Sequence, residues 1–113
     1  MKLTEALEII QAKALTPFDI DGLEVEKVGA ADLLSDVLAF SKPGFLLLTG
    51  QLSVQTLKTA QISEAVAVVF VRGKIPEKEI IKYAVENELP LFSTEKLLFE
   101  TCGLLFENQL KPC

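Results

Sequence analysis

Residues 66–74 read VAVVFVRGK, a run of six apolar residues that ends at two cations around a glycine. Two further apolar runs, at residues 45–48 and 89–92, also end at small or hydroxyl-bearing residues. Continuous apolar runs are typical of parallel strands, because helices cover both faces of such a sheet. A helix-like segment follows each run. The pattern therefore predicts an α/β fold with a mostly parallel sheet.

The residues that follow these strands are expected to lie along one edge of the sheet, where open α/β sheets bind their ligands. Arg72 is the only arginine, and its planar fork of donors suits a carboxylate or a phosphate. Hydroxyls and helix N-terminal amides after the other strands also suit an anion. The predicted ligand-binding edge consists of Thr49, Gly50, Arg72, Gly73, Lys74, Ser93 and Thr94.

Each of these residues also has a purely structural explanation. Gly73 can form a turn, and Ser93 or Thr94 can cap the helix that follows. Arg72 can pair with a neighbouring acid such as Glu77. Only the expected clustering of the residues at one edge favours a binding site.

Two acids, Asp32 and Asp36, are four residues apart and therefore share one face of a helix. Together with a phosphate they could hold Mg²⁺, and they are further candidates for the ligand site. The alternative is that Asp32 caps the helix and Asp36 faces the solvent.

Capping residues and apolar periodicity predict five helices. The first helix is capped by Thr4, and the second is short and stops at Pro43-Gly44. The third lies around 53–64 and is capped by Ser53. The fourth begins at Pro76, and the fifth covers about 95–108. Expected extended segments are 12–15, 23–28 near a sheet edge, 45–49, 66–71 and 90–93. The whole chain, 1–113, is therefore predicted to be a single three-layer α/β domain with four to five strands flanked by helices.

The composition excludes several classes of function. A net charge of −5 disfavours nucleic acid as a partner. The chain has no histidine and no Walker A pattern, which excludes histidine-based catalysis and a P-loop. We therefore expect a protein that is not an enzyme, and no cofactor is assigned. There is neither a bilayer-spanning run nor a signal-like start, so a cytoplasmic location without a membrane partner is expected.

The last predicted helix is apolar on more than one face, and half of all residues are hydrophobic. The helix could be wedged between the sheet and the first helix. Alternatively, one face packs on the sheet and the other on a second subunit. The apolar excess favours a homodimer, with interface candidates Leu98, Cys102, Leu105 and Phe106. The two cysteines, Cys102 and Cys113, do not form a disulfide framework, and they are expected to be a small buried apolar residue and a loose terminal thiol.

Five short motifs occur in order along the chain: ADLLSDVLAF at 31–40, LLTG at 47–50, KTA at 58–60, VFVRGK at 69–74 and ST at 93–94. Together they resemble the DRTGG domain family over nearly the whole chain. That family is similar to the N-terminal domain of HPr kinase/phosphorylase, and it also occurs beside CBS domains and in front of phosphotransacetylase domains. The resemblance implies a regulatory or ligand-sensing module, usually dimeric, and not a kinase.

The resemblance adds Lys58 and Thr59 to the candidate ligand site. Family members more often have Arg-Thr-Ala-Glu where this chain has Lys58-Thr59-Ala60-Gln61. The positive charge is kept, but the bidentate fork and the acid are lost, which would weaken or alter the binding of a phosphate.

The family's aspartate corresponds to Asp32 or Asp36, and its glycines correspond to Gly50, Gly73 and Gly103. Gly103 lies inside the last predicted helix, where glycine costs about 1 kcal/mol relative to alanine. Close helix approach across a subunit boundary would explain it, and so would a packing constraint within one subunit.

Two functions follow from these observations. The first is a non-catalytic regulatory module that binds an anionic metabolite or nucleotide at the carboxyl edge of its sheet. The second is a dimeric interaction module that docks on a partner enzyme without a small-molecule ligand.

Overall fold

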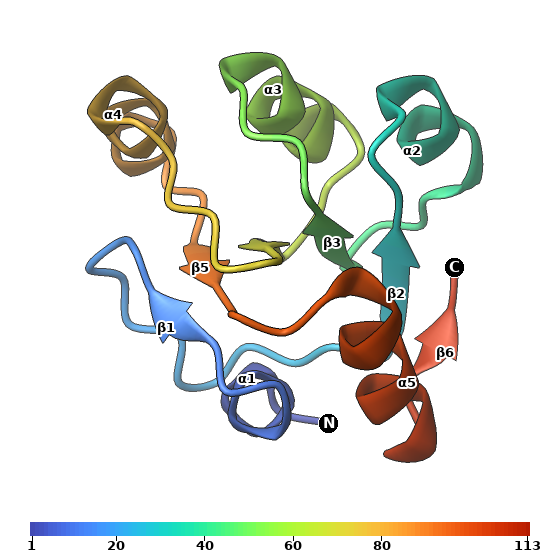
Figure 1. Cartoon of the computed structure of the whole chain (residues 1–113). Coiled ribbons are helices and arrows are strands. Elements are labelled where there is room, and N and C mark those ends of the chain that lie inside the picture. The colour runs from blue at the N-terminus through green and yellow to red at the C-terminus, as the bar shows by residue number, and fades with distance from the viewer.

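The computed structural model describes all 113 residues as one six-stranded sheet between two layers of helices (Figure 1). The strand order is β1-β5-β4-β3-β2-β6, in which β1 pairs antiparallel with β5 and all other pairs are parallel. The strands are β1 Lys13–Ala14, β2 Lys27–Ala30, β3 Leu46–Thr49, β4 Ala67–Phe70, β5 Leu91–Ser93 and β6 Lys111–Pro112. The helices are α1 Leu3–Ile9, α2 Leu34–Phe40, α3 Val54–Ile62, α4 Lys78–Glu86 and α5 Leu98–Glu107.

The central strands β3, β4 and β5 are buried over their whole length. Successive side chains point to opposite faces, so Leu46 and Leu48 join the cluster under α1 and α5, whereas Leu47 joins the cluster under α2, α3 and α4. Figure 1 shows these three helices on one face and α1 with α5 on the other. The three-layer α/β prediction is confirmed.

The helix boundaries agree with the prediction in part. Ser53 caps α3, because its Oγ accepts a hydrogen bond of 3.1 Å from the N–H of Thr56. Thr4 is not a cap, since α1 already begins at Leu3 and its N-cap residue, Lys2, makes no side-chain cap bond. α5 begins at Leu98 and not at 95, because residues 94–97 turn first; the Lys96 N–H donates to Thr94 Oγ1 at 3.3 Å.

Two edge features differ from the prediction. The alternating segment 23–28 was expected to be a strand, but β2 starts only at Lys27, and Glu24 forms a single isolated bridge with Lys2. A sixth strand, β6, was not predicted because it has two exposed residues and one of them is a proline. Backbone bonds from Lys111 N to Glu26 O (2.9 Å) and from Cys113 N to Val28 O (3.2 Å) fix it beside β2. Cys113 is therefore half-buried rather than a loose thiol.

The four candidates for a subunit interface on α5 differ in their exposure. Leu105 is 1% exposed in the core, and Leu98 is half-buried against the same cluster, since both point toward the sheet and α1. Phe106, the fourth candidate, is 68% exposed, and Phe99, which was not a candidate, is 90% exposed. Cys102 lies between these faces and is half-buried.

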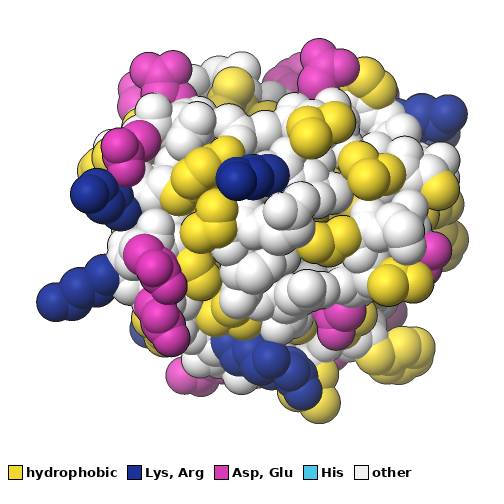
Figure 2. Space-filling model, turned by 90° about the horizontal axis from the view of Figure 1, so that it is seen from above, with side chains coloured by type: hydrophobic (Ala, Val, Ile, Leu, Met, Phe, Trp, Pro, Cys, Tyr) yellow, Lys and Arg dark blue, Asp and Glu magenta, His cyan; other side chains and the backbone are white.

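The opposite layer presents a mixed surface. Figure 2 looks down on α2, α3 and α4, and it shows apolar side chains spread between polar atoms, with most charges toward the rim. Ile62 at the end of α3 is 73% exposed. No helix in the structure combines the length and the apolar character needed to cross a membrane.

Candidate functional site

The carboxyl ends of β3, β4 and β5 lie level with one another, as the sequence predicted. Thr49 pairs with Phe70, and Phe70 pairs with Ser93, so the residues that follow these strands meet at one edge. The edge contains the 49–50 turn, the Arg72–Lys74 turn and the segment after Ser93.

The turn after β4 holds Arg72 in an unusual backbone conformation. Arg72 and Gly73 have φ values of 66° and 68°, and the Lys74 N–H reaches Val71 O at 3.5 Å, which is the pattern of a type I′ turn. Glycine and asparagine are the usual residues at such positions, and arginine is strained there. The N–H groups of Arg72 and Gly73 donate to Lys96 O and Thr94 O, both at 2.9 Å, so the turn is anchored to the neighbouring loop.

Gly50 separates an acid from the arginine. A Cβ built at Gly50 would lie 3.5 Å from both carboxylate oxygens of Asp32 and 3.7 Å from Nε of Arg72. The glycine therefore leaves a small space that both the carboxylate and the guanidinium border. No ion pair joins the two charges across this space.

Asp32 acts at this edge and not as a helix cap. Its Oδ1 accepts hydrogen bonds from the Gly50 N–H at 2.7 Å and from Thr49 Oγ1 at 3.2 Å, whereas the N-cap residue of α2 is Leu33. The expected capping role is therefore wrong, because the carboxylate satisfies the amide beyond β3 instead. Its second oxygen, Oδ2, has no protein partner.

The two cations of the edge differ in how they are held. Lys74 is half-buried, and its Nζ donates to Gly50 O at 3.0 Å. Arg72 is exposed and makes no ion pair, so the expected pairing with Glu77 is wrong; Lys96 and Glu100 form the one ion pair of the chain. The guanidinium thus remains free for a ligand.

The hydroxyls of the edge are already used within the fold. Thr49 Oγ1 donates to Asp32 and accepts from the Gln51 N–H, and Thr94 Oγ1 donates to Ile10 O at 2.6 Å. Ser93 is 7% exposed within β5. These side chains shape the edge, and neither Ser93 nor Thr94 caps a helix.

Three candidates are not brought to the free guanidinium. Asp36 is exposed in the first turn of α2 and makes no side-chain hydrogen bond or ion pair. Lys58 is exposed on α3, about one helical turn beyond the start of that helix. Thr59 is 2% exposed, so its side chain lies in the interior and not on the surface of α3. A part for these three in ligand binding stays a prediction from the family resemblance alone.

Sequence analysis did not identify one group that shapes this edge, the backbone carbonyl of Lys96. The carbonyl oxygen of Lys96 accepts from the Arg72 N–H and so holds the arginine turn in place. Only its backbone is involved, which is why no side-chain pattern could have indicated it.

The edge is an open surface. Five cavities of the structure have none of Asp32, Gly50 and Arg72 in their lining. The groups on offer are a guanidinium, an ammonium and a carboxylate oxygen. Such a set can bind an anionic group that is joined to a hydrogen-bond donor.

Comparison with protein-family models and with curated proteins gives no match. Among solved structures, the chain is similar to the crystal structure of the CBS and DRTGG domains of the regulatory region of Clostridium perfringens pyrophosphatase, complexed with its activator, diadenosine tetraphosphate. The TM-score is 0.71 at 20% sequence identity, and the match covers 92% of this chain and 45% of that chain. The two therefore share a fold, and this chain spans less than half of the other's length.

Proposed function

We propose that the chain is a DRTGG-type regulatory module that binds an anionic metabolite or nucleotide at the edge formed by Arg72, Lys74 and Asp32, and that it catalyses no reaction. The observation that carries this proposal is the free guanidinium of Arg72, held in a left-handed turn without an acid partner. A side chain held at such a φ costs free energy, and functional sites are places where such a cost is found.

The geometry suggests how such a ligand would sit. The guanidinium of Arg72 and Nζ of Lys74 both lie close to Gly50 and can take an anionic oxygen, such as a phosphate. Asp32 Oδ2 also lies close to Gly50 and can accept a bond from a hydroxyl. A nucleotide offers both groups, and the structural neighbour was solved with a dinucleotide activator.

A thermal-shift experiment with AMP, ATP, diadenosine tetraphosphate and inorganic phosphate tests the proposal, with adenosine as the uncharged control. A ligand at a hundred times its Kd should stabilise the protein by about 2.7 kcal/mol. Arg72→Ala should abolish the shift. Lys82→Ala, which removes a positive charge from an exposed position on α4, should retain it.

A second variant, Gly50→Ala, keeps every charge and fills the space between Asp32 and Arg72. Its methyl group makes contacts of 3.5 and 3.7 Å, which are ordinary van der Waals distances, so the protein should fold and bind more weakly. If no nucleotide or phosphate shifts the wild type, or if Arg72→Ala responds as strongly as the wild type, the proposal is wrong.

The interaction module without a small-molecule ligand remains the second candidate, because Phe99 and Phe106 are exposed on α5. It predicts that none of the four anions shifts the melting temperature while α5 still binds a protein surface.

A further inference from the structure

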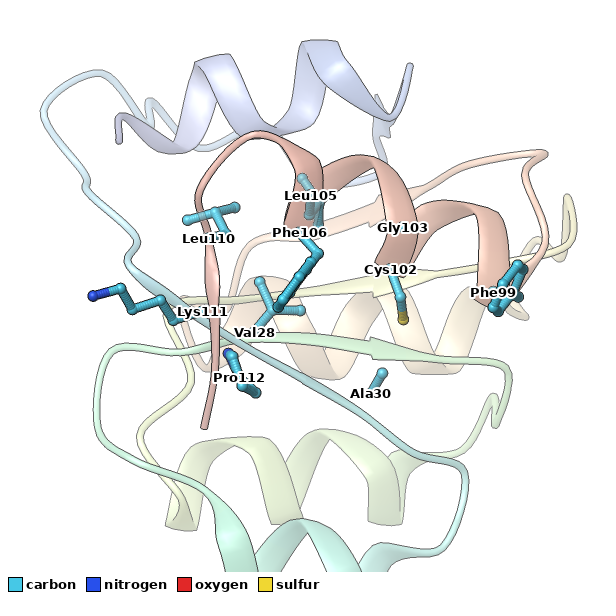
Figure 3. Close-up of a pocket in the computed structure, with 10 residues that line it drawn as sticks. All are labelled: Val28, Ala30, Phe99, Cys102, Gly103, Leu105, Phe106, Leu110, Lys111 and Pro112. Atoms are coloured by element: carbon cyan, nitrogen blue, oxygen red, sulfur yellow. The ribbon is translucent and has the colours of Figure 1, made fainter.

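An apolar trough of about 380 Å³ lies between α5 and the edge of the sheet formed by β2 and β6. Figure 3 shows Cys102 and Phe106 pointing from α5 toward Val28 and Ala30, with Phe99 at one end of the trough. Ala30 is the last residue of β2. One end of the trough therefore lies at the carboxyl ends of the strands, where the proposed ligand binds.

We infer that this trough takes the base of a nucleotide whose phosphate lies at Arg72 and Lys74, and that the base is held by stacking on Phe99 and not by hydrogen bonds. The inference rests on the proposed function, because it extends the same ligand site from the edge of the sheet into the trough. It narrows the ligand from any anionic metabolite to one in which a flat aromatic ring is joined to a phosphate through a hydroxyl-bearing group.

The groups at the carboxyl edge follow the order of the strands. β4, β3 and β2 are neighbours in the sheet, and they lead to Arg72, Gly50 and Asp32 respectively. The trough lies beside β2, and Ala30 in its lining is two residues before Asp32. From β4 to the trough, the protein thus offers a guanidinium, a carboxylate oxygen and an apolar surface. A nucleotide presents a phosphate, a ribose and a base in the same order.

Backbone contacts bring the start of α5 close to the arginine turn. The Arg72 N–H donates to Lys96 O at 2.9 Å, and Phe99 is three residues after Lys96. Three residues of chain span at most about 11 Å. Leu48 of β3 points into the cluster under α1 and α5, and Gly50 is two positions further, so its open position faces the layer that contains the trough. One small ligand can therefore contact both the edge and the trough.

The lining of the trough suits a base and does not distinguish one base from another. Phe99 is 90% exposed, more than any other large apolar side chain of the chain. An aromatic ring stacks on every base, because every base has a π-face. The lining contains no side-chain hydroxyl, amide or carboxylate, and Lys111 lies at the end opposite Phe99 (Figure 3). No side chain near Phe99 can therefore tell adenine from guanine.

Calorimetric titration of the full chain with AMP, GMP, ribose 5-phosphate and inorganic phosphate tests this inference. AMP and GMP should have Kd values within about threefold of each other, and both should bind about tenfold or more tightly than ribose 5-phosphate, which lacks the base. Phe99→Ala should weaken AMP binding by a similar factor and leave the binding of ribose 5-phosphate unchanged. The matched control is Ile62→Ala, which removes a 73% exposed side chain from the other helix layer and should bind AMP as the wild type does.

The results separate this inference from the proposed function. If none of the phosphate compounds binds, the proposed function fails and the inference fails with it. If AMP binds and Arg72→Ala abolishes the binding, the proposed function holds. The inference is then overturned by ribose 5-phosphate that binds as tightly as AMP, by unchanged AMP affinity in Phe99→Ala, or by a preference between AMP and GMP above about tenfold.

Alkylation of Cys102 reports directly whether the base enters the trough. In a Cys113→Ser background Cys102 is the one remaining thiol, and it lines the trough. Saturating AMP should slow its alkylation several-fold, whereas saturating ribose 5-phosphate should leave the rate unchanged because it reaches only the edge. An alkylation rate that AMP does not change, in a protein that calorimetry shows to bind AMP, would place the base elsewhere and contradict the inference.

Discussion

At the scale of single residues, Arg72 connects the backbone to the proposed function. Its left-handed conformation is set by two hydrogen bonds of the turn, from Arg72 N and Gly73 N to the loop around Thr94. The same bonds aim the side chain at Gly50. The turn thus fixes the backbone from which the arginine side chain extends, and under the proposed function this would lower the entropy lost on binding.

This conformation makes a prediction about stability. Because a residue with a Cβ is strained at this φ, Arg72→Gly should be more stable than Arg72→Ala by about 1 kcal/mol, the reverse of the usual order of these residues. Urea denaturation of the two variants measures the difference. Equal stabilities, or a more stable alanine variant, would show that the turn is not strained at this position.

Cys102 predicts a dependence of stability on pH. Burial raises the pKa of its thiol above the ordinary value, and a backbone hydrogen bond offsets part of the rise. As pH increases, the unfolded thiol therefore loses its proton before the folded one does. The contribution of Cys102 to stability is present at neutral pH and is lost above the ordinary thiol pKa of about 8.5.

The measurement compares the wild type with Cys102→Ala by urea denaturation, at neutral pH and above the thiol pKa. We expect the difference in the free energy of unfolding between the two proteins to shift in favour of Cys102→Ala at the higher pH. All other titrating groups are shared by the two proteins and cancel. A difference that is the same at both pH values contradicts the raised pKa.

At the scale of elements, two glycines should respond in opposite ways to the same substitution. Gly103→Ala on α5 should stabilise the isolated subunit by about 1 kcal/mol, because the new methyl group meets nothing and alanine favours the helix. Gly29→Ala in β2 should destabilise it by about 1–3 kcal/mol, because its Cβ would lie 2.8 Å from Cε1 of Phe40 and 3.2 Å from the Phe45 ring.

Urea denaturation at concentrations where the protein is monomeric measures both glycine effects. If Gly103→Ala lowers stability under these conditions, the glycine has a role within the subunit, and a packing constraint there explains it.

The elements themselves were predictable where local chemistry decides them. The apolar runs that became β3, β4 and β5 were identified because a parallel strand must be apolar on both sides. Ser53 was identified as a cap because its chemistry is local. β6 escaped prediction, since a two-residue edge strand has neither a length nor a periodicity of its own and depends on bonds to β2.

At the scale of the whole molecule, one sheet serves both helix layers. Leu47 points into the cluster under α2, α3 and α4, and Leu48 points into the cluster under α1 and α5, although the two are neighbours in β3. Damage on either face therefore weakens a sheet that both layers share, and the two layers are expected to unfold together.

Leu47→Ala and Leu48→Ala should each destabilise the protein by about 2–5 kcal/mol, since both leucines are fully buried. Each variant should unfold in one transition, with the same midpoint by circular dichroism and by the fluorescence of Tyr83 on α4. Separate midpoints for the two signals would contradict the expectation of a single cooperative unit.

The sequence by itself determined the α/β class, the parallel core and the edge at which Arg72 and Gly50 meet. It did so because strand composition, turn residues and crossover connections are properties of neighbours along the chain. The tertiary structure alone decided that Asp32 bonds to Gly50 rather than to its own helix, that Thr94 is used internally, and that α5 leaves a trough beside β2. These features depend on contacts between residues far apart in the chain, whose distances no local pattern encodes.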